Sequence, residues 1–132
     1  IQIEDKTISF LNTHLAWAKT TAEEEHQTKQ GEIFLSYLKN KVEAPFVLTG
    51  DFNLDPNQPL IHKLNSVAKN LVAENNIVNT LNERIHRPRV LFPPGAAVDY
   101  IFVSPDIKVN KFEVLEKEDL SDHLALTAEI EV

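Results

Sequence analysis

The chain has 132 residues, 42% hydrophobic and 25% charged, which suits one globular domain with a buried core rather than a disordered chain. Its 13 basic and 20 acidic residues give a net charge of −7. This charge argues against non-specific coating of DNA, because such binding depends on neutralising many phosphates. The absence of cysteine excludes disulfides, thiolate metal sites and thiol nucleophiles. It is compatible with a cytoplasmic location, but the sequence assigns no compartment.

The start of the chain is unusual. It opens on Ile1, contains no methionine and has no signal or transit pattern. We therefore expect residues 1–132 to be a single partial domain of a longer protein. No apolar run approaches the roughly 20 residues that a membrane span requires, so no span is expected.

Strand and helix patterns alternate in the first part of the chain. Residues 1–3 and 7–11 flank a polar turn and predict a hairpin, whose second arm runs on to Leu15. Residues 22–42 are rich in helix formers, and Pro45 ends this helix. Its first half is polar all round, so the apolar stripe is expected only in the second half, at Phe34, Leu35, Leu38 and Val42.

The remaining elements are shorter. The apolar run 46–49 predicts a buried strand, and Pro59 favours the start of a second helix. Residues 71–90 are ambiguous, with a short strand or helix near 71–73. Further strands are expected at residues 98–104, 109–115 and 124–132. This order of elements predicts an α/β or α+β fold.

Polar clusters lie at the ends of four predicted strands, at residues 12–15, 50–53, 98–101 and 121–124. Open α/β sheets place their sites at such ends, and the carboxylate and amide oxygens of these clusters suit Mg²⁺ or Mn²⁺. Taken singly, each cluster has a structural explanation. Gly50-Asp51 and Ser121-Asp122 are typical of turns, Asp99 can satisfy backbone amides, and His14 can be a hydrogen-bonded core histidine.

Taken together and in this order, the clusters resemble the endonuclease/exonuclease/phosphatase superfamily, the DNase I-like metal-dependent phosphoesterases. The motifs that carry the resemblance are Gly-Asp-x-Asn at 50–53, Asp-Tyr-Ile at 99–101 and Ser-Asp-His at 121–123. The resemblance implies the C-terminal half of a four-layer α/β sandwich. We expect one mainly antiparallel sheet with two helices packed on one face.

The resemblance also implies a role for each matching residue. Asp51 orients or deprotonates the attacking water, Asn53 helps to hold the phosphate and the metal, and His123 stabilises charge on the scissile phosphate. Asp99 pairs with His123, fixes its tautomer and raises its pKa. The expected catalytic residues are His14, Asp51, Asn53, Asp99 and His123, and the expected metal ligands are Asp51, Asn53 and Asp122.

The family's N-terminal half supplies an Asn and a Glu, the Glu being a principal metal ligand, and neither has a counterpart before Asn12. We therefore expect Mg²⁺ or Mn²⁺ to bind weakly and the chain alone to turn over poorly or not at all. Half of a sandwich also leaves one sheet face bare. Self-association through this exposed face is therefore expected.

All three arginines, Arg84, Arg87 and Arg89, lie within one stretch upstream of Asp99. The guanidinium fork matches phosphate, so this stretch is a candidate substrate-phosphate clamp. A solvated loop that has simply collected charge explains the arginines equally well.

The sequence thus favours Mg²⁺-dependent hydrolysis of a phosphodiester, with nucleic acid as the first substrate. The alternative is a phosphatase or phosphodiesterase acting on a phospholipid or a small phosphorylated metabolite. A non-catalytic binding module is the hypothesis from a different class, and the retained Asp51, Asn53, Asp99 and His123 argue against it.

Overall fold

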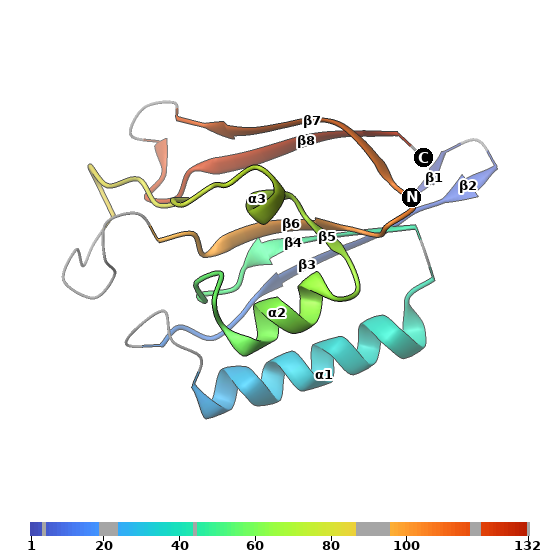
Figure 1. The fold of residues 1–132 in the computed structure, drawn as a ribbon, viewed down its shortest axis with the longest axis horizontal. Coiled ribbons are helices and arrows are strands. Elements are labelled where there is room, and N and C mark those ends of the chain that lie inside the picture. Colours follow the sequence, from blue (N-terminus) through green and yellow to red (C-terminus); the bar gives the residue numbers. More distant parts are fainter. Residues whose placement is uncertain (4, 19–23, 44, 87–95, 117–119, 132) are drawn as a thin grey trace.

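The structure is a computed structural model that describes residues 1–3, 5–18, 24–43, 45–86, 96–116 and 120–131 (Figure 1). The predicted hairpin is present: β1 (Gln2–Ile3) pairs antiparallel with β2 (Lys6–Thr7). The chain then enters a separate strand, β3 (Ser9–His14), instead of continuing the second arm of the hairpin.

A four-stranded sheet forms the centre of the molecule, in the order β3-β4-β6-β5. It contains β4 (Phe46–Asp51), β5 (Lys69–Asn70) and β6 (Asp99–Val103). Strands β3 and β4 run parallel because the helix between them carries the chain back to the same end of the sheet, whereas β6 is antiparallel to both β4 and β5.

Two longer strands near the C-terminus form their own antiparallel pair, β7 (Lys108–Leu115) with β8 (Ala125–Glu131). The strand pairs are mainly antiparallel, as predicted, and among the described residues only β3 and β4 pair parallel. The prediction of a single sheet is wrong, since the described residues form one four-stranded sheet and two separate two-stranded sheets. The alternation of apolar and polar residues along a strand predicts which of its side chains face the core. It does not specify which strand lies beside it.

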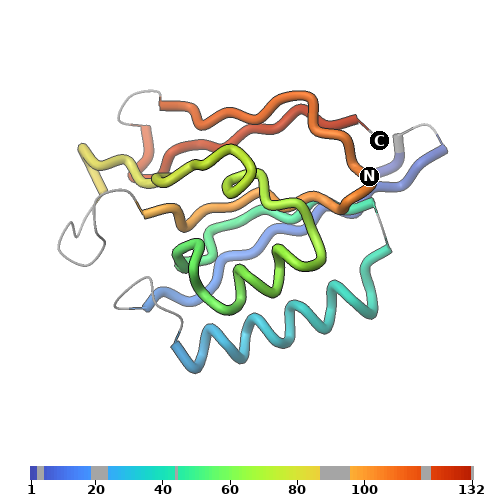
Figure 2. The backbone as a smooth tube through the Cα atoms, in the orientation of Figure 1, coloured from blue at the N-terminus to red at the C-terminus, as the bar shows by residue number. Residues whose placement is uncertain are grey.

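The two expected helices are present and contribute to one core on the same side of the central sheet (Figures 1 and 2). They are α1 (Glu25–Lys41) and α2 (Pro59–Asn65). A one-turn helix, α3 (Leu71–Glu74), is the element that the sequence left ambiguous. Among the described residues, no helix is both long enough and apolar enough to cross a membrane.

The first half of α1 is polar in sequence, but one of its polar side chains is buried. Gln27 is fully buried, and its side-chain amide donates to the carbonyls of Ala16 at 2.9 Å and Asn53 at 3.4 Å. Its side-chain oxygen accepts the backbone N–H of Glu24 and thereby helps to cap the helix. A polar residue at this position is therefore a structural link between α1 and the loop after β4.

The sheet face away from the helices is also not bare. Val47, Ile101 and Val103 on this face are buried in a second apolar cluster, against which residues of β7 and β8 pack. The expectation of one bare face is wrong for these residues. Phe10 of β3, by contrast, has half of its surface exposed.

Candidate active site

Three of the predicted site residues lie in one row across the central sheet. His14 at the end of β3 is the register partner of Asp51 at the end of β4, and Asp51 is the partner of Asp99 at the start of β6. Residues directly opposite one another project from the same face of a sheet. Nε2 of His14 accordingly lies 3.4 Å from Oδ2 of Asp51, with the His14 side chain 72% exposed and the Asp51 side chain 19% exposed.

Gly50 allows β3 and β4 to approach closely beside this row. Its φ of +153° is one that other residues rarely adopt, and a Cβ atom built on it would overlap the backbone oxygen of Thr13. The glycine of the Gly-Asp-x-Asn motif is therefore required by the backbone, one residue before Asp51.

Asn53 closes the turn that follows Asp51. Its backbone N–H donates to Oδ1 of Asp51 at 2.8 Å, and its φ of +53° is one that asparagine tolerates. The side-chain amide nitrogen donates to the carbonyl of Leu15 at 2.9 Å, so Asn53 is buried and joins this turn to the end of β3.

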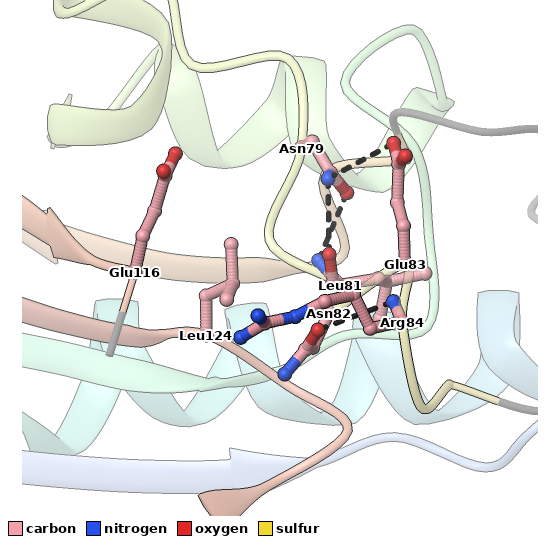
Figure 3. Close-up of a pocket in the computed structure, with 7 residues that line it drawn as sticks. All are labelled: Asn79, Leu81, Asn82, Glu83, Arg84, Glu116 and Leu124. Carbon is pink, nitrogen blue, oxygen red and sulfur yellow. Dashed lines mark hydrogen bonds between the residues drawn. The ribbon is translucent and has the colours of Figure 1, made fainter. Parts of the chain in front are cut away.

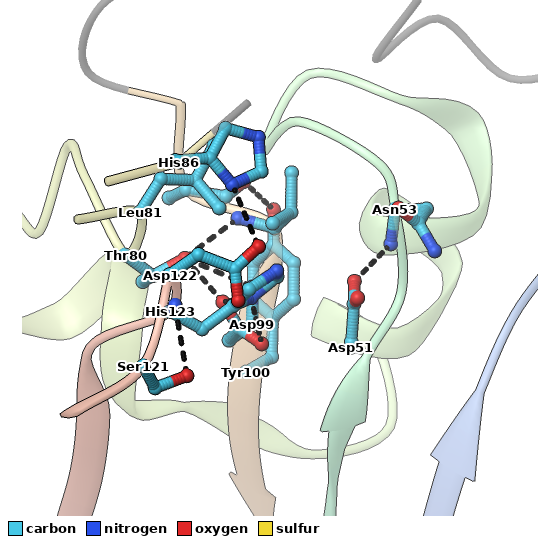
Figure 4. A network of polar contacts seen from close by, with 12 residues as sticks. Asp51, Asn53, Thr80, Leu81, His86, Asp99, Tyr100, Ser121, Asp122 and His123 are labelled. Atoms are coloured by element: carbon cyan, nitrogen blue, oxygen red, sulfur yellow. Dashed lines mark hydrogen bonds and ion pairs between the residues drawn. The ribbon is translucent and has the colours of Figure 1, made fainter. Parts of the chain in front are cut away.

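Asp99 and His123 form the pair that the sequence predicted (Figure 4). Nδ1 of His123 lies 3.1 Å from Oδ1 and 2.9 Å from Oδ2 of Asp99. The hydroxyl of Thr80 donates to Oδ2 of Asp99 at 2.7 Å and accepts the backbone N–H groups of Val98 and Asp99. Thr80 thus fixes the carboxylate that in turn orients the imidazole.

A second connection holds the His123 loop in place. Leu81 forms an isolated antiparallel bridge with His123. Asn82 donates its backbone N–H to the carbonyl of Asp122 at 2.9 Å and its side-chain amide to the carbonyl of Ser121 at 3.1 Å. Sequence reasoning missed Thr80 and Asn82 because they lie in the stretch without a clear periodic pattern.

Charge and burial shift two pKa values in this site. The hydrogen bond from His123 to Asp99 raises the pKa of the imidazole, and the charges of Asp99, Asp51 and Asp122 act in the same direction against the opposing effect of burial. Burial raises the pKa of the Asp51 carboxyl, with a further contribution from the charge of Asp99.

Among the described residues, two groups of side chains have donor atoms close enough to hold a metal ion. Asp51, Asp99 and His123 form one group, with one donor atom from each within 4.8 Å of the others. His86, Asp122 and His123 form the other. The structure therefore brings Asp51 beside Asp99 and His123, whereas the exposed Asp122 lies beside His86 at 3.5 Å.

The arginine clamp is described only at its first residue. Arg84 lines a hollow of about 420 Å³ that shares no lining residue with the group of Asp51, Asp99 and His123 (Figure 3). Two acidic residues, Glu83 and Glu116, line the same hollow. Arg87 and Arg89 lie outside the described residues.

Comparison of the sequence with models of protein families identifies the family of this chain. The model of the Endonuclease/Exonuclease/phosphatase family matches residues 27–123. A comparison with curated protein sequences gave no match.

Solved structures share the fold. The mannosyl-6-phosphatase Bt3783 of Bacteroides thetaiotaomicron VPI-5482 is 21% identical with a TM-score of 0.71, and the match covers 93% of this chain and 51% of that one. An endonuclease/exonuclease/phosphatase from Bacteroides vulgatus is 23% identical with a TM-score of 0.69, covering 90% and 47%. The human Nocturnin catalytic domain with bound sulfate is 22% identical with a TM-score of 0.58, covering 92% and 46%. This chain thus spans about half the length of these proteins.

Proposed function

The chain belongs to the endonuclease/exonuclease/phosphatase family, and from this premise we propose that its site serves metal-dependent hydrolysis of a phosphodiester, with nucleic acid as the first candidate substrate. The observation that carries the proposal is the Asp99–His123 pair beside Asp51. An imidazole whose pKa is raised by a carboxylate, next to a second carboxylate, provides both a proton donor and a proton acceptor.

His123 is the donor in this proposal. Its raised pKa keeps it charged nearer neutrality, so that it can donate a hydrogen bond to the phosphoryl oxygen on which negative charge develops. Asp99 holds Nδ1 of the ring, which directs Nε2 toward the substrate. Asp99 is thus a positioning residue for His123.

Asp51 is the acceptor. Its pKa is raised by burial, which makes it a stronger base than an ordinary carboxylate, and it takes a proton from the attacking water. His14 lies 3.4 Å from Asp51 and is largely exposed, which suits contact with the substrate phosphate. Asn53 holds the turn that orients Asp51.

The donor set fits a hard divalent cation, because carboxylate and amide oxygens are the ligands that Mg²⁺ and Mn²⁺ prefer. Asp51, Asn53 and Asp122 are the residues we propose to hold it. A bound cation acts as a Lewis acid on the phosphate and lowers the pKa of water. We propose that this chain forms one half of the family's domain. The Glu that serves the family as a principal metal ligand then belongs to the other half. Mg²⁺ therefore binds weakly to this chain, which has little or no activity alone.

Binding of a phosphodiester tests the proposal without requiring turnover. The imidazole resonances of all five histidines are followed by NMR while dimethyl phosphate is added, with and without Mg²⁺. We expect the His123 resonance to shift most and the Asp99→Asn variant to bind at least tenfold more weakly. His26, an exposed histidine on α1, is the internal control. Equal shifts at His26 and His123 would contradict the proposal.

A second candidate substrate is a small phosphorylated metabolite or a phospholipid headgroup. The net charge of −7 favours it over a long polyanion, because electrostatic attraction to nucleic acid is then weak. Hydrolysis of bis-p-nitrophenyl phosphate, p-nitrophenyl phosphate and single-stranded DNA by the complete protein separates these classes. A monoester preference would support the second candidate, and no hydrolysis of any of them would support a non-catalytic module.

A further inference from the structure

A second cluster of metal-ligating side chains lies beside the proposed phosphate site. His86, Asp122 and His123 each place one donor atom within 4.8 Å of the other two. Nδ1 of His86 lies 3.5 Å from Oδ2 of Asp122, and the rings of His86 and His123 meet edge to face with their centroids 5.6 Å apart (Figure 4). None of the roles proposed above uses His86.

Backbone hydrogen bonds hold His86 against the His123 loop. The His86 backbone N–H donates to the carbonyl of Asn82 at 2.8 Å, which closes a turn. Asn82 is itself bonded to Asp122 and Ser121. The His86 side chain is only 13% exposed. The imidazole and the Asp122 carboxylate are therefore brought together by the fold rather than by a chance contact of long side chains.

The donor atoms are those that zinc prefers. Two imidazoles and one carboxylate suit Zn²⁺ and related transition metals, whereas Mg²⁺ favours oxygen donors alone. Ligand bonds of about 2.0–2.2 Å in a tetrahedron separate two ligand atoms by roughly 3.3–3.6 Å. The 3.5 Å between His86 and Asp122 is close to this spacing.

The third ligand is already oriented for coordination. Nδ1 of His123 is bonded to Asp99, so Nε2 is the nitrogen that would bind a metal. A carboxylate on the far nitrogen of a metal-binding histidine fixes the ring and makes the ligand more basic. Thr80 fixes Asp99 in turn.

We propose that His86, Asp122 and His123 form a binding site for Zn²⁺ or a similar transition-metal ion, distinct in chemistry from the carboxylate site for Mg²⁺. Three protein ligands leave the fourth position to water or to an anion. The zinc site shares His123 with the proposed phosphate site and Asp122 with the proposed Mg²⁺ site. If the proposed function is correct, bound Zn²⁺ removes the imidazole that the phosphate needs, and Zn²⁺ therefore inhibits hydrolysis.

Binding of the metal alone tests the site. The apo protein is titrated with Zn²⁺ by calorimetry and with Co²⁺ by visible absorption, in which four-coordinate Co²⁺ gives a strong ligand-field band. We expect one Zn²⁺ per chain, retained in excess Mg²⁺. The His86→Ala and Asp122→Asn variants should each bind at least tenfold more weakly and lose the Co²⁺ band. Circular dichroism checks that both variants are folded.

His26→Ala is the matched control. His26 also faces a carboxylate, with Nδ1 3.7 Å from Oε2 of Glu24, but it belongs to neither of the three-residue groups found among the described residues. Its substitution should leave Zn²⁺ binding unchanged. Wild-type affinity in both His86→Ala and Asp122→Asn, or an equal loss in His26→Ala, would overturn the proposal. Intact Zn²⁺ binding without inhibition of the complete protein would instead count against the proposed function.

Discussion

The hydroxyl of Thr80 donates a 2.7 Å hydrogen bond to Oδ2 of Asp99 and accepts the backbone N–H of the same residue at 3.1 Å. One buried side chain therefore fixes both the carboxylate of Asp99 and the start of its strand. Because Asp99 holds the imidazole of His123, the orientation of that ring depends on Thr80 through Asp99.

The first prediction concerns this threonine. Thr80→Val keeps the shape of the side chain but leaves the backbone N–H groups of Val98 and Asp99 without their acceptor. We expect the free energy of unfolding in urea to fall by about 1–3 kcal/mol. Thr80→Ser, which keeps the hydroxyl, should recover most of this loss. Equal destabilisation by the two substitutions would show that the hydroxyl contributes nothing.

The second prediction concerns the pH dependence of stability. The folded pKa of His123 is raised, chiefly by its hydrogen bond to Asp99. The stabilisation from this pair is therefore fully present below the unfolded pKa of about 6.5 and is lost as pH rises through the folded pKa. Asp99→Asn removes it.

Urea unfolding between pH 5.5 and 9, with a chelator present, measures this effect. The difference in unfolding free energy between wild type and Asp99→Asn should narrow with rising pH, by about 1.4 kcal/mol for each unit by which the measured His123 pKa is raised. The Asp122→Asn variant should show a smaller change of this difference with pH, because the charge of Asp122 contributes least to the raised pKa of His123. A difference that stays constant over this range would contradict the assignment.

Much of the fold follows from local sequence signals. The second helix begins at Pro59, as its favourable first position predicts, and strand β4 lies on the apolar run before Gly50. The parallel pairing of β3 with β4 and the separation of the β7–β8 pair were not predicted, because both depend on contacts between distant parts of the chain.

The same distinction, between local motifs and contacts between distant residues, applies to the candidate site. Asp51, Asp99 and His123 belong to short motifs and do come together. Thr80 and Asn82 carry no motif, and they act through hydrogen bonds to residues 19 and 39 positions away in the sequence. His86 belongs to none of the four polar clusters, and its approach to Asp122 follows from a turn that the sequence did not predict.

The third prediction tests self-association. Phe10 on the sheet face away from the helices is 51% exposed, and burial of such a ring against a second copy would remove apolar surface from water. We expect sedimentation velocity to show concentration-dependent dimers that Phe10→Ser abolishes. Ile33→Ser, at a residue of α1 that is 73% exposed, should leave them unchanged. A wild-type chain that stays monomeric at high concentration would contradict this expectation.

The last prediction uses the glycine before Asp51. Gly50→Ala places a methyl group against the backbone oxygen of Thr13, in a conformation that alanine rarely adopts. Backbone atoms cannot rotate away, so β3 and β4 must separate. The stability should fall by at least about 1 kcal/mol, and the contact between His14 and Asp51 should be lost.

Gly31→Ala provides the comparison. The three atoms nearest to a methyl group there are side-chain carbons of Leu60, with Cδ2 at 2.6 Å, and a side chain can shift where a backbone oxygen cannot. Alanine also favours the helix by about 1 kcal/mol, which offsets part of the overlap. Thermal unfolding and the NMR shift of His14 should therefore change more in Gly50→Ala than in Gly31→Ala. If both variants behave alike, the close approach of β3 and β4 does not set the geometry at Asp51, and the row of three residues must be held by other contacts.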